Sequence, residues 1–439
     1  MQGFIVTIRV KRLRDIETDR RVMIRFLQYT FGGSDMSNLD HRKSTRTIKV
    51  TDTNGMPVKN ARLRLLQKSH EFLFGCGGFD FLPLTNAEDE KVRAHFKDLT
   101  DKWLKIYNYA TLPFYLGGFE PEEGKPETKS RMNAALYLKE RGVTVKGHPL
   151  VWHTVCADWL MAYDNKTILE KLLGRIDREV TDFKGIIDKW DVINEVVIMP
   201  VFDKYDNAVT RICKEYGRVP LVKAVFDEAK KMNPGAELLL NDFNTTKKYE
   251  DLIEECLDAG VSITTIGIQS HQHQKYWGPD KIYDVLERFS RFGLPIHFTE
   301  NTLTSGDYLV PEELDDLNDF QVTAEEWPST PKGEERQMKQ MEEMYRILFE
   351  HPQVKAITGW DFTDGMWLNA PSGVVRRDGT VKPSYELLDH LINHEWHTDE
   401  TVITDGEGNV TVTGFKGGYE LIPEDTAVAL SADSKEFTL

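Results

Sequence analysis

Residues 189–195 read KWDVINE, a short run in which Trp190, Val192 and Ile193 are apolar and the last residue is a carboxylate. A short run centred on aromatic and β-branched side chains is typical of a strand, and apolar side chains at neighbouring positions favour one that is covered on both faces, as in a parallel sheet. Residues 295–300 read PIHFTE and have the same form, with a glutamate again in the last place. The two stretches therefore predict two buried parallel strands, each with an acidic side chain at its carboxyl end.

Outward from these stretches, short β-rich runs alternate with amphipathic helical patterns between residues 71 and 392. The strand candidates are 71–76, 106–112, 144–152, 189–195, 237–243, 265–270, 295–300 and 356–361. Eight βα units in series predict an α/β fold, the closed (β/α)8 TIM barrel, with its active site at the carboxyl ends of the strands.

The two ends of the chain have a different pattern. Residues 46–72 alternate apolar and polar side chains around Asn54-Gly55, a hairpin signal, and residues 401–422 repeat that style with glycine-rich turns. Because two or three strands alone are marginal in water, we expect both ends to pack together as one small β-module.

This reasoning divides the chain into an N-terminal β-rich segment at 1–69, a catalytic barrel at 70–395, and C-terminal strands at 396–439 that pack with the first segment. Weak alternation within residues 1–45 could add strands to the module. We expect a structural brace rather than a glycan-binding module, because Phe415 and Tyr419 stand singly among glycines.

Charge limits the partners. The formal net charge of −16 argues against nucleic acid or an anionic membrane as a partner, since both need a basic face, whereas a neutral glycan is compatible with it. Arg9, Lys11 and Arg12 interrupt the first apolar stretch before an export signal can form. The expected location is therefore cytoplasmic, or secreted if a leader has been removed, and the oligomeric state stays open.

Glu195 and Glu300 end the fourth and the seventh strand candidates, and would face each other across the barrel mouth. A lone strand-end glutamate is more often an ion-pairing surface residue, but two at matching ends favour chemistry. At a separation of about 5–5.5 Å they would suit a retaining double displacement on a glycoside. Glu195 would protonate the departing oxygen while Glu300 attacks the anomeric carbon.

Other polar and aromatic residues gather at the same strand ends. They are His148, Trp152 and His153 after the third strand, Gln269 and His271 after the sixth, and Trp360 and Trp367 after the eighth. Aromatic faces above a polar rim suit sugar rings, although core packing is the alternative for each tryptophan and the preferred interpretation of His153. Asn241 and Asn244 end the fifth strand, where they could bind the substrate or brace Glu195.

Histidine spacing gives no metal signal. His271 and His273 are two residues apart, and His148 and His153 are five apart, so neither pair has the helical spacing of a zinc protease. The sequence has no P-loop, no GxSxG elbow and no GxGxxG after a strand. We therefore expect neither a metal nor another cofactor.

Taken together, these motifs resemble glycoside hydrolase family 10, the (β/α)8 endo-β-1,4-xylanases. The matching stretches are GHPLVWH at 147–153, WDVINE at 190–195, LLNDFN at 239–244, GIQSH at 267–271, HFTE at 297–300 and the pair Trp360 and Trp367. The resemblance covers roughly residues 70–393.

The resemblance implies a role for each of the matching side chains. Glu195 would be the acid/base and Glu300 the nucleophile, with Asn194 as the partner of the sugar 2-hydroxyl. His148 and Trp152 would wall the −1 subsite, His271 would bond the nucleophile, and Gln269 and Trp360 would complete the subsite. The implied partner is a β-glycan polysaccharide or oligosaccharide.

The chain also departs from the family pattern. Residues 111–118 lack the Glu-Asn…Lys group that holds the −2 xylose, Val155 replaces a glutamine, and Thr302 replaces an aspartate. The loop at 303–332 is long and acidic, and a loop of that size on the catalytic face favours a functional role. Three functions stay open: a xylanase, a hydrolase of a different or decorated β-glycan cleaved from a chain end, and a non-catalytic glycan-binding barrel.

Overall fold

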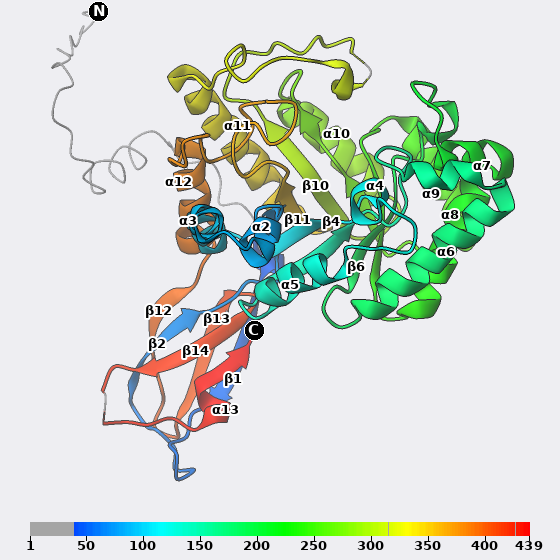
Figure 1. Cartoon of the computed structure of the whole chain (residues 1–439). Helices are drawn as coiled ribbons and strands as arrows, with labels where there is room; N and C mark the ends of the chain where they lie inside the picture. Colours follow the sequence, from blue (N-terminus) through cyan, green and yellow to red (C-terminus); the bar gives the residue numbers. More distant parts are fainter. Residues whose placement is uncertain (1–38, 315, 426) are drawn as a thin grey trace, which may run out of the picture. The chain divides into compact units, whose positions relative to one another are not determined.

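The computed structural model describes residues 39–314, 316–425 and 427–439, and Asp40–Leu439 form one compact unit (Figure 1). The export-signal question and residues 1–38 of the weak strand pattern lie outside the described residues, whereas the last part of that pattern begins β1 (Lys43–Lys49). In the described part of the chain, no helix is long and apolar enough to cross a membrane.

A ring of parallel strands forms the centre of this unit. In the described residues the hydrogen-bonded order is β11-β3-β4-β5-β6-β7-β8-β10, and the pairing of β10 with β11 closes the ring. The eight strands are β3 (Leu73–Gly77), β4 (Tyr109–Pro113), β5 (Thr144–His148), β6 (Lys189–Asn194), β7 (Glu237–Asp242), β8 (Thr265–Ile268), β10 (Ile296–Leu303) and β11 (Val354–Gly359). The expected TIM barrel is confirmed.

Helices lie between successive strands and cover the barrel. They are α2 (Phe81–Asn86), α3 (Glu90–Ile106), α4 (Leu116–Phe119), α5 (Thr128–Lys139), α6 (Asn165–Asp182), α7 (Ala208–Tyr216), α8 (Arg218–Met232), α9 (Lys247–Asp258), α10 (Gly278–Ser290), α11 (Pro331–Glu350) and α12 (Pro383–His390). Side chains fix several of their starts: Asp89, Asp164, Asn207, Thr246 and Thr330 each accept a hydrogen bond from a backbone N–H in the first turn.

The register between neighbouring barrel strands brings their carboxyl ends to the same level. In β6 and β7 every residue after the first is buried, as expected for strands covered on both sides. Asn194 at the end of β6 lies opposite Asn241 in β7, which in turn lies opposite Gly267 in β8. The polar residues that follow the apolar runs therefore meet at the carboxyl end of the barrel.

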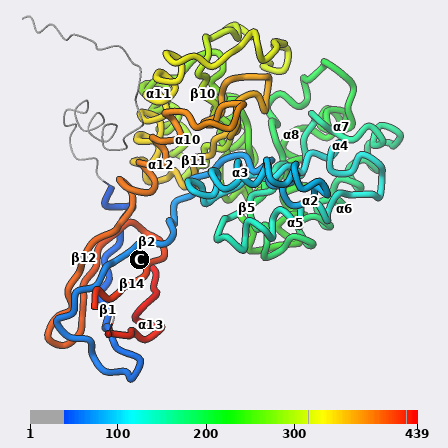
Figure 2. The backbone as a smooth tube through the Cα atoms, turned by 60° about the vertical axis from the view of Figure 1, so that its left-hand side comes forward, coloured from blue at the N-terminus to red at the C-terminus, as the bar shows by residue number. Residues whose placement is uncertain are grey.

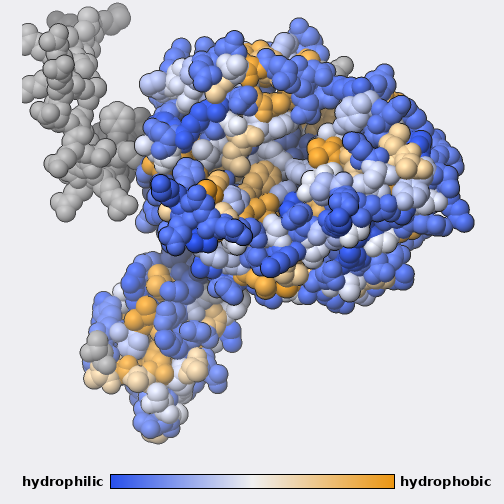
Figure 3. Space-filling model, viewed as in Figure 1, coloured by the Kyte–Doolittle hydropathy of each residue, from blue (hydrophilic) through white to orange (hydrophobic). Residues whose placement is uncertain are grey.

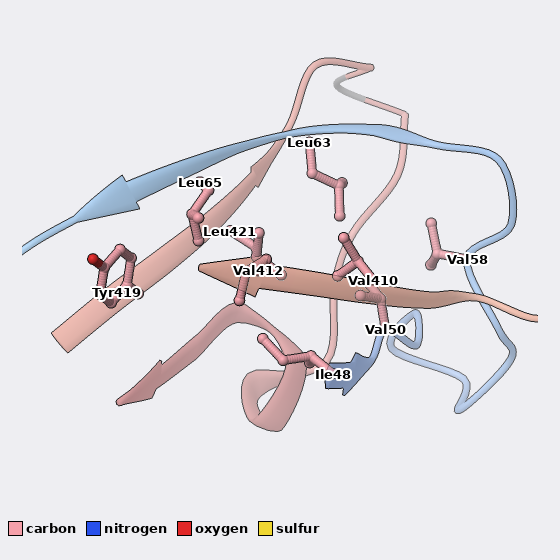
Figure 4. Packing of buried hydrophobic residues seen from close by; sticks show 9 residues of the cluster. All are labelled: Ile48, Val50, Val58, Leu63, Leu65, Val410, Val412, Tyr419 and Leu421. Carbon is pink, nitrogen blue, oxygen red and sulfur yellow. The ribbon is translucent and has the colours of Figure 1, made fainter. Parts of the chain in front are cut away.

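The chain ends form the β-module. β1 (Lys43–Lys49) pairs antiparallel with β13 (Asn409–Phe415), and a second sheet has the order β12 (Asp399–Ile403), β2 (Arg62–Gln67), β14 (Gly418–Pro423) and β15 (Glu436–Thr438), beside the short α13 (Ala432–Lys435). In Figures 1 and 2 these strands lie side by side. Buried side chains pack together between them (Figure 4): Ile48, Val50, Val58, Leu63, Leu65, Val410, Val412, Tyr419 and Leu421. The expected module is confirmed.

The hairpin expected around Asn54-Gly55 is only partly present. Gly55 has a φ of +77°, and Thr51 bridges Pro57 across the turn. The longer strands on either side do not pair with each other, because β1 and β2 belong to different sheets and each finds its partner near the other end of the chain. Phe415 and Tyr419 are 7% and 2% exposed, so neither presents a free face to a glycan.

Candidate active site

Glu195 follows the last residue of β6 and is only partly exposed. Trp152 Nε1 donates to its Oε2 at 2.8 Å, while Gln269 Nε2 and Asn194 Nδ2 donate to its Oε1 at 3.1 and 3.3 Å. Burial, reinforced by the nearby charges of Asp242 and Glu300, raises the pKa of Glu195 to about 8 despite the donors Gln269 and Trp152. Glu195 therefore keeps a proton at neutral pH.

Glu300 lies within β10 and is 4% exposed. Asn241 Nδ2 donates to its Oε1 at 2.7 Å, and His271 Nε2 donates to its Oε2 at 3.1 Å. Burial alone would raise the pKa of Glu300, but His148, His271 and Lys146 together hold it below its ordinary value. The pKa values of the two carboxyl groups are thus pushed apart, one toward the acid form and one toward the ion, as in glycosidases.

Asn194 links the two carboxyl groups through a shared acceptor. Its Oδ1 accepts from Asn241 Nδ2 at 2.8 Å and from Gln269 Nε2 at 3.2 Å, and each of these donors also reaches one carboxyl group. Asn241 is fully buried, and its Oδ1 accepts from Thr299 at 2.7 Å. With both amide protons already used, Asn241 braces Glu300 rather than Glu195 and has no proton left for a sugar.

Close packing fixes the position of Asn241. A Cβ atom on Gly267 would lie 2.3 Å from Asn241 Oδ1, so only glycine fits at that place in β8. Asn244, the other asparagine expected to bind substrate or brace Glu195, accepts instead from the backbone N–H of Thr246 at 3.0 Å. It lies beyond the strand and shapes the turn into α9.

A buried ion pair stands behind Glu300, and the sequence did not reveal it. Lys146 Nζ lies 2.6 Å from Asp191 Oδ2, and both side chains are fully buried. His148 Nδ1 donates to the same oxygen at 2.7 Å and lies 4.0 Å from Glu300 Oε1. Burial opposes ionisation of Asp191, but Lys146 and His148 outweigh it and lower the pKa of Asp191. The pair fixes His148 beside Glu300.

Thr302, which stands where the family pattern has an aspartate, supports His271 with its hydroxyl group. Thr302 Oγ1 lies 3.4 Å from His271 Nδ1 and 3.1 Å from His273 Nδ1, and accepts from the backbone N–H of Gln272 at 3.1 Å. The Nδ1 side of the His271 ring thus faces the Thr302 hydroxyl group, and the Nε2 side donates to Glu300. A hydroxyl group thus replaces the expected carboxylate.

Aromatic rings surround the carboxyl groups. Trp360, 7% exposed, has its ring centre 5.3 Å from that of His148, and Trp367 lies 4.5 Å from His271. Tyr115, in the stretch that lacks the family's −2 group, lies 5.5 Å from His148 and 5.6 Å from Trp152. Burial, together with Glu300 and Glu195, raises the pKa of Tyr115 well above its ordinary value. Tyr115 is therefore a further candidate residue of the site, one that the sequence did not predict.

The structure brings ten of the side chains predicted for the site into one cluster and leaves Asn244 outside it. The ten are Glu195, Glu300, His148, Trp152, Asn194, Asn241, Gln269, His271, Trp360 and Trp367. His153 packs against Phe202 with ring centres 4.6 Å apart, which confirms its expected packing role. No group of three His, Cys, Asp or Glu side chains in the described residues could hold a metal ion.

Backbone strain marks the same face. Val155, Glu195 and Ser270 have φ values of +51°, +57° and +54°, a region that side chains other than glycine seldom adopt. Such residues cost roughly 1–3 kcal/mol each and cluster at functional sites. All three follow barrel strands, and their residue types do not predict a positive φ.

Large apolar side chains that stay exposed also occur in the loops after barrel strands. They are Val155, Val201, Tyr205, Phe243, Leu309 and Met366, with exposed fractions of 37–61%. Figure 3 shows hydrophobic residues gathered toward the middle of the barrel surface between hydrophilic borders. Apolar contacts are therefore available to a ligand at this face.

Comparison with known proteins shows the family of this chain. The family model for glycosyl hydrolase family 10 matches residues 117–389. The chain belongs to glycosyl hydrolase family 10. The resemblance drawn from the sequence motifs is confirmed.

Curated relatives of this family 10 chain include two of different kinds. The anti-sigma-I factor RsgI6 of Acetivibrio thermocellus is 24% identical over 387 residues, which cover 87% of this chain and 45% of that protein. A beta-1,4-xylanase of Dictyoglomus thermophilum is 29% identical over 244 residues, which cover 53% of this chain and 64% of that protein. The chain thus spans about half to two thirds of these relatives.

Among solved structures, this family 10 chain is similar to xylanase 10B from Thermotoga petrophila RKU-1, solved in complex with xylobiose. The TM-score is 0.59 at 21% identity, covering 74% of this chain and 95% of that one. A GH10 structure from Paenibacillus barcinonensis gives a TM-score of 0.57 at 20% identity, covering 73% and 94%. These likenesses support the barrel fold.

Proposed function

We propose that this protein is a retaining glycoside hydrolase that cleaves β-1,4-xylosidic bonds in xylan or xylo-oligosaccharides. The observation that carries the proposal is the opposite environment of two neighbouring carboxyl groups. The pKa of Glu195 is raised to about 8, and that of Glu300 is lowered by His148, His271 and Lys146 against the effect of burial. The xylanase names of relatives and neighbours support the choice of sugar.

In the first step a Glu300 oxygen attacks the anomeric carbon and the glycosidic C–O bond breaks. Glu195 gives its proton to the leaving oxygen, so that a covalent glycosyl-enzyme ester remains. In the second step water attacks the same carbon, Glu195 takes the water proton, and the Glu300 carboxylate leaves. His271 and Asn241 donate to Glu300, and these bonds aim the carboxylate at its target.

Sugar recognition falls to the side chains around this pair. Trp152 and Trp360 wall the subsite of the cleaved sugar, with His148 between them. Asn194, Gln269 and His271 offer hydrogen bonds, and Trp367 covers the rim. Tyr115 stands where the family holds the next sugar with charged and amide groups, so we expect an apolar ring contact in place of direct hydrogen bonds at that point.

The test is hydrolysis of aryl β-xylobioside and aryl β-cellobioside side by side with a panel of plant polysaccharides. Glu300→Ala and Glu195→Ala should each lower turnover of xylan by roughly 100-fold or more. Glu424→Gln removes an exposed carboxylate that pairs with Arg62 in the β-module and serves as the matched control. Retained activity in either active-site variant would exclude the assignment, and activity confined to another substrate would exclude xylose.

A second candidate is a glycan-binding barrel without turnover. The observation in its favour is that the relative whose match covers 87% of this chain is named as an anti-sigma-I factor. In that case the wild-type protein would bind xylo-oligosaccharides in calorimetry and release no reducing sugar. Measurable turnover that is lost in Glu300→Ala would rule this candidate out.

A further inference from the structure

Residues 304–330, with 315 outside the described part, connect β10 to α11, and we call this segment the strap (yellow at the top of Figure 1). The strap takes part in a small core in which Trp327 is 1% exposed and packs with Val310 of the strap and with Ala370 of the loop after β11. Trp327 Nε1 donates to the carbonyl oxygen of Asp307 at 2.7 Å. The long acidic loop predicted from the sequence is therefore a folded element.

Neighbouring loops hold the strap on its near side. Gln274 Nε2 donates to three of its carbonyl oxygens at 2.8–3.2 Å, from the loop that follows β9 (His271–Gln272). From the loop after β11, Trp367 Nε1 donates to Asn318 Oδ1 at 3.3 Å and Asn369 Nδ2 donates to the carbonyl oxygen of Val322 at 3.0 Å. These attachments lie beside β10, where the strap begins.

Lys204 attaches the strap on the far side. Lys204, in the loop after β6, has its Nζ 2.5 Å from Asp316 Oδ2 and 2.7 Å from Asp319 Oδ1. Asp316 also acts electrostatically on His153, which follows β5. In the barrel order, β7 and β8 separate β6 from β10 on one side and four strands separate them on the other. The strap therefore spans most of the width of the mouth.

The attachments of the strap lie beside the two strands that position the carboxyl groups, β6 and β10. On one side His271 joins Glu300 to Trp367, whose indole reaches Asn318 of the strap. On the other side Lys204 and the acid/base candidate Glu195 follow the same strand, β6. A glycan between the two carboxyl groups must run across the line from β6 to β10, and the strap runs along that line.

We propose that the strap, fixed by Lys204, makes this protein a hydrolase of short xylo-oligosaccharides that enter by a chain end, in preference to polymeric xylan. This inference rests on the proposed function. An internal segment of a polymer can bind in an open groove, but it cannot reach a site that the strap covers. A short chain can reach that site because its end can enter beneath the strap. Trp152, Glu195 and Trp367 keep part of their surface exposed, so solvent still reaches the site.

The fastening is weak enough to open. The side chains of Lys204, Asp316 and Asp319 are 33%, 29% and 54% exposed, so the ion pairs are partly solvated and screened by salt. Removing them should raise kcat/KM on soluble xylan, relative to kcat/KM on aryl β-xylobioside, by about threefold to tenfold, equivalent to roughly 0.6–1.4 kcal/mol.

The experiment compares that ratio in the wild type, Lys204→Ala and Lys275→Ala. Lys275 makes an exposed ion pair with Glu312, also in the strap, but from the side already held by Gln274, so it is the matched control. We expect the ratio to rise only in Lys204→Ala, and Lys204→Asp combined with Asp316→Lys and Asp319→Lys to bring it back toward the wild type. In the wild type, increasing salt should raise the same ratio without any substitution.

An unchanged ratio in Lys204→Ala and in high salt would overturn the inference, as would an equal rise in Lys275→Ala. If the wild type hydrolyses aryl β-xylobioside but the ratio stays unchanged in Lys204→Ala and in high salt, the proposed function stands and only the role of the strap is refuted. Wild-type protein that hydrolyses neither substrate would refute both.

Discussion

Replacement of Glu195 by glutamine should make the protein more stable at neutral pH while it abolishes turnover. The pKa of Glu195 is raised from 4.5 in the unfolded chain to about 8 in the folded one. Below pH 4.5 both states carry the proton and the group contributes nothing. Between pH 4.5 and 8 the unfolded chain gives up its proton and the folded chain keeps it, so the free energy of unfolding falls as pH rises.

The size of the effect follows from the pKa shift. Each pH unit above the unfolded pKa costs about 1.4 kcal/mol, which gives an upper bound of roughly 3.5 kcal/mol at pH 7. Because water reaches part of the Glu195 side chain, solvent screening reduces this to about 1–2 kcal/mol. A domain of about 400 residues gains roughly 1.2 °C in Tm per kcal/mol, so Glu195→Gln should unfold about 1–3 °C higher than the wild type.

Differential scanning calorimetry at pH 4 and pH 7.5 measures the difference. We expect no gain at pH 4 and the full gain at pH 7.5. Glu300→Gln is the matched control with the opposite sign, since the pKa of Glu300 is lowered and its ionised form stabilises the fold above the unfolded pKa. That variant should be less stable at pH 7.5 and recover as pH falls. A Glu195→Gln variant that is equally or less stable at pH 7.5 would refute the reasoning.

Three further predictions concern the site and the module. Gly267→Ala puts a methyl group 2.3 Å from Asn241 Oδ1 and should lower kcat on aryl xylobioside by roughly 10–100-fold, so wild-type kcat would contradict the brace assigned to Asn241. Trp152→Phe removes a donor that lowers the pKa of Glu195, so the alkaline limb of the kcat/KM profile should move above its wild-type position near pH 8; a limb that stays or moves down would argue against that hydrogen bond. Leu421→Ala, in the module core, should cost about 2–5 kcal/mol of stability in denaturant unfolding with an unchanged KM, and a raised KM would point to glycan binding by the module.

The sequence predicted those residues of the site whose positions depend on the local pattern of apolar and polar residues along one strand. Glu195 and Glu300 each end an apolar run, so strand period and barrel topology suffice to bring them to one face. Lys146 gave no such signal, because its partner Asp191 lies on the neighbouring strand and only lateral register brings the two together. The long acidic loop was visible in the sequence, but its attachment to Lys204 was not, since that contact joins two loops from distant parts of the barrel.

The shared β-module also affects how the chain folds during synthesis. Thr45 in β1 and Thr413 in β13, whose hydroxyl groups are 2.8 Å apart, are separated by 368 residues. At typical translation rates the ribosome needs roughly 20–70 s to make the chain between them. Throughout that time β1 exposes Ile48 and an unpaired strand edge, and the barrel closes first, since β11 is made before β13. The last strands to be made therefore complete the first, and a ribosome that stalls before β13 releases a chain with an open, aggregation-prone edge.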